Sequence, residues 1–126
     1  MNREIRPTKK FSRQIKKRKR DSRWDPIFKG NLPSKIDGQK RSPWKFINDT
    51  LAADNKIPDY FYSHSLKGYN KKIKKTLKKL DGQSYDIDVK ELHFDGYNGD
   101  HLLIYTIVKD YIYLLQIGTH SELYKK

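Results

Sequence analysis

The fold is decided by residues 101–124, which read HLLIYTIVKDYIYLLQIGTHSELY. Two apolar runs, 102–108 and 111–117, lie on either side of the polar pair Lys109-Asp110. Apolar runs without polar alternation are typical of strands buried on both faces, and a two-residue break between them is typical of a tight turn. We therefore predict an antiparallel hairpin at the centre of a sheet, followed at once by a polar elbow that carries a histidine.

The segment upstream of the hairpin has the pattern of a further strand. Tyr85, Ile87 and Val89 alternate with polar residues, which is the period of a half-buried strand, and residues 91–94 continue it. Residues 95–100 then combine glycine, asparagine and aspartate and predict a turn.

Helical patterns occupy much of the chain before residue 82. Thr8 is a suitable N-cap for a helix that runs to about Arg20, and Ser42, followed by proline, is a suitable start for a second helix. The apolar stripe of residues 69–80, which is stopped by a glycine, predicts a third helix with lysines around it.

Two shorter features complete the pattern. Residues 5–6 precede a proline, a position that favours extended backbone, and predict a short strand. Residues 21–42 contain too many prolines and glycines for one long helix, although Trp24, Ile27 and Phe28 could tuck a short turn against the core. Helices first and antiparallel strands later predict a small α+β domain, with N-terminal helices packed on an antiparallel-rich sheet of roughly four to five strands.

Length and composition limit the class of protein. The 126 residues are enough for one domain with one modest core. The chain has no cysteine, which excludes disulfides and thiolate metal sites. No apolar run reaches the length of a membrane span, and the first residues lack the apolar core of a signal peptide. We expect a soluble cytoplasmic protein with no membrane partner.

Positive charge is concentrated in two parts of the chain. The 28 Lys and Arg against 15 Asp and Glu give a net charge of +13. Residues 1–45 hold 16 basic and 4 acidic residues, a surplus of 12, and seven lysines lie between Lys67 and Lys79. This segregation favours a polyanionic partner, either nucleic acid or an acidic protein, over a face that only aids solubility.

Four histidines lie at or near predicted strand ends or loop edges, where their side chains could converge on one cleft. They are His64, His93, His101 and His120. Imidazole changes charge near neutral pH, with an unperturbed pKa of about 6.5, so a pair can divide acid and base roles. Two alternatives stay open on this evidence. The histidines could be structural, or they could bind zinc, although the chain lacks the close ligand spacing typical of zinc sites.

Several motifs occur in a fixed order along the chain. They are His64-Ser65-Leu66-Lys67-Gly68, His93, Asp100-His101-Leu102-Leu103-Ile104-Tyr105, Gln116-Ile117-Gly118-Thr119-His120 and Tyr124. Together with residues 3–11, this ordered set resembles the YafQ-type members of the RelE/ParE superfamily of bacterial toxins. The resemblance implies the small RelE-like (microbial RNase-like) fold in a single domain, residues 1–126, with basic insertions at 21–42 and 69–85.

The resemblance also implies an activity. The family consists of toxins of type II toxin–antitoxin systems, which cleave mRNA on the ribosome by attack of the RNA 2′-hydroxyl on the adjacent phosphate. Cleavage needs neither a metal nor another cofactor, and a cognate antitoxin restrains it. The implied catalytic residues are His64, His93, Asp100 and His120, with His93 or His120 as the proton carriers. The expected partners are mRNA, ribosomal RNA against the basic helices, and an acidic antitoxin; the free toxin is expected to be monomeric.

The substrate contacts that the resemblance implies include several departures from the family pattern. The set is Gln116, Tyr124, His101, Lys71, Lys72 and Lys75. Gln116 replaces an arginine, so charge in the transition state needs another cation, for which the lysines of residues 71–79 are candidates. His101 replaces a tryptophan, and Tyr124 would stack on a base.

Other interpretations stay open. The loop between His93 and Asp100 is about three residues longer than in the family pattern, which makes Asp95 an alternative to Asp100 as the functional acid. The chain could instead be a non-catalytic member that binds RNA or the ribosome through its basic face. It could also be a ParE-like toxin directed at DNA gyrase, although that branch needs no set of histidines.

Overall fold

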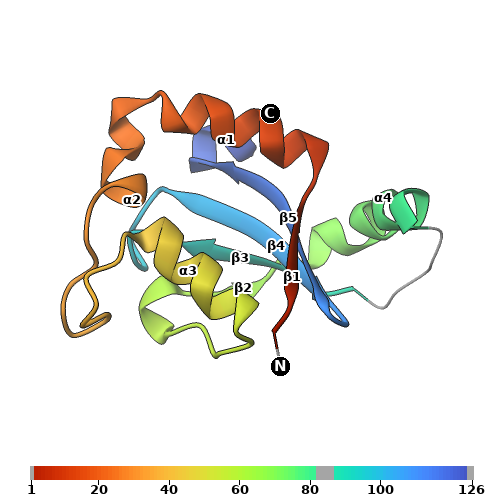
Figure 1. Cartoon of the computed structure of the whole chain (residues 1–126). Coiled ribbons are helices and arrows are strands. Elements are labelled where there is room, and N and C mark those ends of the chain that lie inside the picture. The colour runs from red at the N-terminus through yellow and green to blue at the C-terminus, as the bar shows by residue number, and fades with distance from the viewer. Residues whose placement is uncertain (1, 82–86, 125–126) are drawn as a thin grey trace.

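The computed structural model describes residues 2–81 and 87–124, which form a five-stranded sheet with helices on both faces (Figure 1). The strands are β1 (Glu4–Pro7), β2 (His64–Ser65), β3 (Val89–His93), β4 (Leu102–Val108) and β5 (Tyr111–Gly118). Their order across the sheet is β1-β5-β4-β3-β2. β1 pairs with β5 in parallel, and the other neighbours are antiparallel. The predicted α+β class and the predicted central hairpin, β4–β5, are confirmed.

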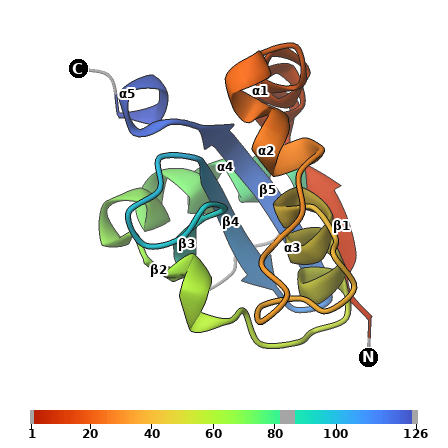
Figure 2. The same cartoon turned by 90° about the vertical axis from the view of Figure 1, so that its left-hand side faces the viewer.

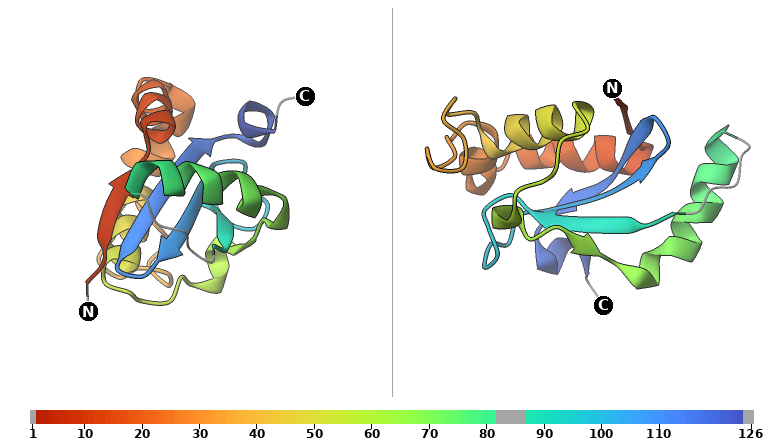
Figure 3. Two further views of the ribbon diagram at one scale, coloured as in Figure 1. Left: turned by 90° about the vertical axis from the view of Figure 1, so that its right-hand side faces the viewer. Right: turned by 90° about the horizontal axis from the view of Figure 1, so that it is seen from below.

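The helices divide between the two faces of the sheet. They are α1 (Lys9–Lys19), α2 (Asp25–Phe28), α3 (Pro43–Ala52), α4 (Asn70–Asp81) and α5 (His120–Leu123), with single 3₁₀ turns at Ser22–Trp24, Asp59–Phe61 and Lys67–Tyr69. Figures 2 and 3 show α1, α2 and α3 on one side of the sheet and α4 and α5 on the other. None of the described helices is both long and apolar enough to cross a membrane.

The helix starts follow from local capping. The Thr8 hydroxyl accepts a hydrogen bond from the Phe11 amide at the start of α1, and the Ser42 hydroxyl accepts one from the Lys45 amide at the start of α3. The sequence predicts both of these caps. A third cap, at Thr119, starts the short helix α5 where only a polar elbow was expected.

Each face of the sheet has its own apolar core. Under α1, α2 and α3 the core includes Phe11, Trp24, Ile27, Ile47, Leu51, Leu103 and Tyr105. Under α4 it consists of Ile73, Leu77, Val89, Ile104, Val108, Tyr113 and Leu115. Trp24 and Ile27 are almost fully buried, which confirms the predicted short turn against the core. Burial on both faces explains why β4 and β5 are mostly apolar, with Thr106 and Gln116 as the polar exceptions.

Two strands differ from the sequence prediction. β2 was not predicted, because a two-residue strand has no recognisable period and forms only by pairing with β3. β3 begins at Val89, whereas the alternating pattern predicts a strand that already includes Ile87. Tyr85, where that pattern begins, lies outside the described residues.

A β-bulge in β5 shapes the face that carries α4. Ile104 pairs with Gln116 while its neighbour Tyr105 pairs with Leu114, so Leu115 is an extra residue on β5. As a result Leu115 and Gln116 both line the groove beside α4.

Candidate active site

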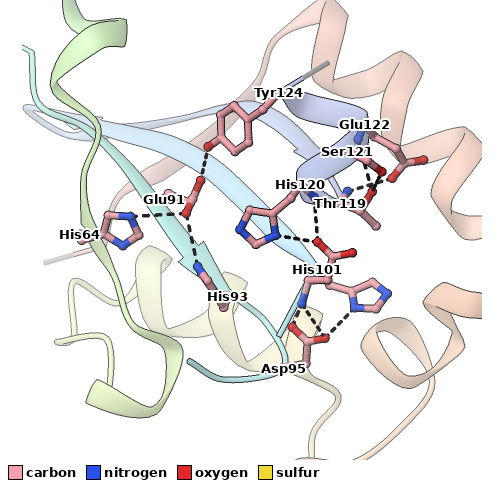
Figure 4. Close-up of polar contacts among 11 residues, drawn as sticks. His64, Glu91, His93, Asp95, His101, Thr119, His120, Ser121, Glu122 and Tyr124 are labelled. Carbon is pink, nitrogen blue, oxygen red and sulfur yellow. Dashed lines mark hydrogen bonds and ion pairs between the residues drawn. The ribbon is translucent and has the colours of Figure 1, made fainter. Parts of the chain in front are cut away.

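Three of the four predicted histidines converge at one corner of the sheet, on the face that carries α4 and α5 (Figure 4). His64 lies on β2, His93 ends β3 and His120 begins α5. The ring centroids of His64 and His93 are 6.1 Å apart, and those of His93 and His120 are 5.6 Å apart. Three segments that are distant in sequence thus supply one group of imidazoles, which we call the histidine cluster.

Glu91 lies at the centre of the histidine cluster, although no sequence motif pointed to it. It precedes His93 by two residues, so both side chains lie on the same face of β3. Its Oε1 atom is 3.3 Å from Nε2 of His93 and 3.4 Å from Nε2 of His64. The one signal in the sequence was a glutamate among apolar residues of a predicted strand, because a carboxylate buried in such a strand must be paired. In the structure Glu91 is only 4% exposed.

Tyr124 completes the surroundings of Glu91. Its hydroxyl donates a hydrogen bond to the Oε2 atom of Glu91. Partial burial, together with that hydrogen bond, raises the pKa of the Tyr124 phenol well above its ordinary range, so this hydroxyl remains a donor. The predicted stacking residue therefore also holds the central carboxylate.

His120 is held by Asp100. Nδ1 of the ring lies 2.6 Å from Oδ1 of Asp100, and the backbone amide of His120 donates to the same oxygen at 2.8 Å. Burial opposes ionisation of Asp100, but these hydrogen bonds outweigh it and lower the pKa of the carboxyl below its ordinary value. Because a carboxylate only accepts, Nδ1 carries the proton and Nε2 is left for other groups.

The other two imidazoles differ in how their rings are fixed. His64 donates from Nδ1 to the backbone carbonyl of Tyr62 at 2.8 Å. His93 is 6% exposed, and its Nδ1 atom is buried without a hydrogen-bond partner among the described residues. A buried polar atom of this kind requires an explanation, and catalysis is one of the ordinary ones.

His101 is not part of the histidine cluster. Its Nδ1 atom lies 2.6 Å from Oδ2 of Asp95, and its ring packs edge-on against Trp24, with centroids 4.5 Å apart. Asp95 therefore pairs with His101, and Asp100 pairs with His120. Of the two aspartates that the sequence left as alternatives, Asp100 therefore contacts the histidine cluster, and Asp95 contacts the histidine outside it.

Gln116 and the predicted lysines lie away from the imidazoles. Gln116 is in one row with Ile104 and Glu91, two strands or about 10 Å from Glu91. It lines a groove with Lys72, whereas Lys71 lines a separate hollow on α4 with Lys74 and Ile87. Lys75 is exposed on the same helix. Of these three lysines, Lys72 alone shares a groove with Gln116 among the described contacts.

Exposed aromatic rings surround the histidine cluster. Tyr62, Tyr97 and Tyr124 are the large hydrophobic side chains of the described residues that remain exposed, at 42%, 64% and 37%. The Tyr62 ring lies 4.6 Å from His64 and 4.5 Å from Tyr97, centroid to centroid. Tyr62 also has a left-handed backbone with φ of 48°, which is unusual for an aromatic residue and carries strain. Sequence alone indicated only Tyr124.

The fold has solved relatives of low sequence identity. No protein-family model and no curated protein matches the chain. A copper-bound mutant toxin from Helicobacter pylori matches with a TM-score of 0.59 and 18% identity, over 96% of this chain and 98% of that one. The E. coli DinJ-YafQ toxin–antitoxin complex matches with a TM-score of 0.58 and 16% identity, over 98% and 99%. YafQ from E. coli strain BL21(DE3) matches with a TM-score of 0.55 and 18% identity, over 97% and 98%. The chain therefore has the YafQ/RelE-like fold over nearly its whole length.

Proposed function

We propose that this protein is the toxin of a type II toxin–antitoxin system and cleaves mRNA on the ribosome. The observation that carries the proposal is the approach of His93 to His120, with the second ring held by Asp100. Two imidazoles about one phosphate diameter apart, one of them fixed by a carboxylate, are suited to acid–base cleavage of RNA. Similarity in fold to YafQ, in a chain with a net charge of +13, supports the same assignment.

The proposed reaction is a transesterification. One imidazole takes the proton of the 2′-hydroxyl, the 2′-oxygen forms a bond to phosphorus, and the bond from phosphorus to the 5′-oxygen breaks. The other imidazole gives its proton to the departing 5′-oxygen. Each such acid–base group contributes roughly 10² to 10⁴ in rate. His120 Nε2 and the ring of His93 are the proposed proton carriers.

The other members of the site would position these groups and the RNA. Glu91 contacts His64 and His93 and so orients two rings at once. Tyr62, Tyr97 and Tyr124 offer aromatic faces on which unstacked bases could lie, which is the usual way in which proteins hold single-stranded RNA.

Negative charge on the phosphorane needs a cation that Gln116 does not supply. Lys72 lines the same groove as Gln116 and is the best placed of the predicted lysines. Lys71 and Lys75, together with exposed residues of α1, would contact ribosomal RNA at a greater distance from the reaction. A cognate antitoxin remains the proposed protein partner, by likeness to the DinJ-YafQ toxin–antitoxin complex, and the net charge of +13 favours an acidic one.

The test uses a cell-free translation mixture in which mRNA ends are mapped after the purified protein is added. Wild-type protein is expected to cut mRNA only while ribosomes translate it, and His120→Ala should lower the cleavage rate by about 10² to 10⁴. Ser121→Ala, at the next residue of α5, is the matched control and should cleave at the wild-type rate.

The other outcomes separate the competing functions. Ribosome binding without cleavage by the wild-type protein would favour a non-catalytic member of the fold. In a parallel test by expression in cells, growth arrest that His120→Ala does not relieve, with intact mRNA, would instead favour a target such as gyrase. Equal cleavage by wild type and His120→Ala would contradict the proposed catalytic site.

A further inference from the structure

A row of rings runs through the histidine cluster and continues past it on both sides. The ring centroids of Tyr124 and His120 are 6.2 Å apart, and those of His120 and His93 are 5.6 Å apart. On the other side, the centroid of Tyr62 is 5.5 Å from that of His93 and 4.5 Å from that of Tyr97. The two proposed proton carriers therefore lie in the middle of the row. Tyr124 is at one end, and Tyr62 and Tyr97 are at the other.

Tyr62 and Tyr97 form a corner that is open to solvent. The planes of their rings meet at 77°, and both rings are exposed. Large apolar rings that remain exposed side by side mark a binding surface more often than single exposed residues do. A nucleobase can stack on the face of one ring while its edge meets the other ring, and every base has the π-face that such stacking needs.

The loop of residues 95–100 supplies one wall of this corner and is fixed from within. Asp95 accepts hydrogen bonds from two later backbone amides at 3.2 and 3.3 Å, and its Oδ2 atom lies 2.6 Å from Nδ1 of His101. Gly96 has φ of 94°, in the left-handed region that favours glycine. Tyr97 is thus presented by a loop that is already ordered, which lowers the entropy cost of binding. The loop is also longer than in the family pattern, and that pattern gives no role to Tyr97.

We infer that Tyr62 and Tyr97 form a second base site, which holds the base on the opposite side of the cleaved phosphate from Tyr124 and sets which RNA sequences are cut. The inference rests on the proposed function, because it takes the phosphate to lie between His93 and His120. Bases differ in stacking strength, so a stacking site beside the cut gives a preference among bases at that position.

The binding test uses a short single-stranded RNA that carries 2-aminopurine at one internal position and 2′-O-methyl groups, which prevent attack by the 2′-oxygen. Stacking on an aromatic ring quenches 2-aminopurine fluorescence, so a titration with the full chain reports both the contact and the affinity. Tyr97→Ala, at an exposed position, should weaken binding by about 5- to 150-fold, the range for loss of one base–aromatic stack.

Two matched variants of the same loop are the controls. Tyr97→Phe keeps the ring and should bind as wild type does. Asn98→Ala shortens the next exposed side chain of the loop without removing a ring, and it should also bind as wild type does. Equal weakening by Asn98→Ala would show that any change in the loop weakens binding and would overturn the base site.

The second measurement maps mRNA ends in the translation mixture. Wild-type protein is expected to prefer some bases at one position next to the cut. Tyr97→Ala should still cut but with that preference levelled, whereas Tyr97→Phe and Asn98→Ala should keep it. Weakened binding by Tyr97→Ala with an unchanged preference would overturn the role in sequence selection.

Failure of the second base site and failure of the proposed function give different results. Cleavage by Tyr97→Ala with the affinity and the preference of wild type would overturn the second base site and leave the proposed function standing. Quenching that depends on Tyr97, with no cleavage by the wild-type protein under any condition, would overturn the proposed function and leave the RNA-binding corner standing.

Discussion

At the scale of single residues, the two histidine–aspartate pairs, Asp95–His101 and Asp100–His120, differ in their surroundings. Asp100 and His120 are about half exposed, whereas Asp95 and His101 are more buried and lie against Trp24. The hydrogen bond to Asp95 raises the pKa of His101 against the effect of burial. Burial opposes ionisation of Asp95, but the hydrogen bonds from His101 outweigh it and lower its pKa.

These shifts predict a pH-dependent contribution to stability. The stabilisation of the folded state that comes from the raised pKa of His101 is fully present below the unfolded pKa of about 6.5. It is lost as pH rises through the raised folded pKa. The stabilisation that comes from the lowered pKa of Asp95 is fully present above the unfolded pKa of about 3.9. It is lost as pH falls through the lowered folded pKa. Asp95→Asn should therefore cost about 1 kcal/mol of unfolding free energy near pH 5.5 and less at alkaline pH.

Urea unfolding of wild type and Asp95→Asn across pH measures this difference directly. Asp100→Asn is the matched control, and the effect of that substitution on stability should be smaller because its pair is more exposed. A difference between wild type and Asp95→Asn that does not change with pH would contradict the ion pair.

Single residues also mark the limit of sequence-based prediction at this site. His64, His93, Asp100 and His120 could be picked out because their order along the chain resembles that of the YafQ-type toxins, and their catalytic roles stay predictions. Glu91 could not, because its role arises from pairing of β3 with β2 and from the position of α5, both of which are long-range contacts. The identity of the partner of each histidine depends on the same contacts.

At the scale of elements, α5 is the most delicate part of the candidate site. This single helical turn carries His120 and leads to Tyr124. Its start is a capping box: the Thr119 hydroxyl accepts from the Glu122 amide, and the Glu122 carboxylate accepts from the Thr119 amide at 2.8 Å. Glu122 also pairs with Arg18 of α1 at 3.1 Å, which ties α5 to the rest of the fold.

Thr119→Ala is therefore expected to loosen α5 without unfolding the protein. Loss of an N-cap costs about 1 kcal/mol, which corresponds to roughly a fivefold change in the local equilibrium. Hydrogen exchange at the Glu122 and Leu123 amides should quicken and cleavage should fall by a similar factor, while the melting temperature stays nearly unchanged. Thr119→Ser keeps the hydroxyl and should behave as wild type; equal effects of the two substitutions would contradict the role of the cap.

Elements were predicted well wherever their signals are local. The hairpin was visible as two apolar runs, and α1 and α3 were visible from their caps. The bulge at Leu115 and the edge strand β2 were not visible, because neither has a period and each depends on register with a neighbouring strand. The assignment of 21–42 and 69–85 as insertions stays a prediction.

At the scale of the whole molecule, the uneven charge predicts how RNA affinity depends on salt. Lys71, Lys72 and Lys75 lie on α4, on the face of the sheet that also carries the histidine cluster. Replacing all three with glutamine should lower the slope of log affinity against log salt by up to about 2. Each phosphate of single-stranded RNA that a lysine neutralises adds about 0.7 to that slope, because binding releases its counterion.

The control is a triple substitution with the same change in net charge on the opposite side of the molecule. It replaces the exposed lysines Lys29, Lys35 and Lys40, which follow α2. Fluorescence anisotropy of a labelled RNA at several salt concentrations compares the two variants. If both lower the slope equally, binding follows net charge alone and the α4 face has no special part in it.

The parallel pairing of β1 with β5 also bears on the time at which the site forms during synthesis. Arg6 pairs with Tyr113, 107 residues later, so the first strand waits without a partner until nearly all the described chain has been translated. His120 is made after β5 and is held by Asp100 only once α5 has docked. The two imidazoles of the proposed site therefore meet only after β5 and α5 are in place, so a nascent chain that stops short of His120 carries no complete site.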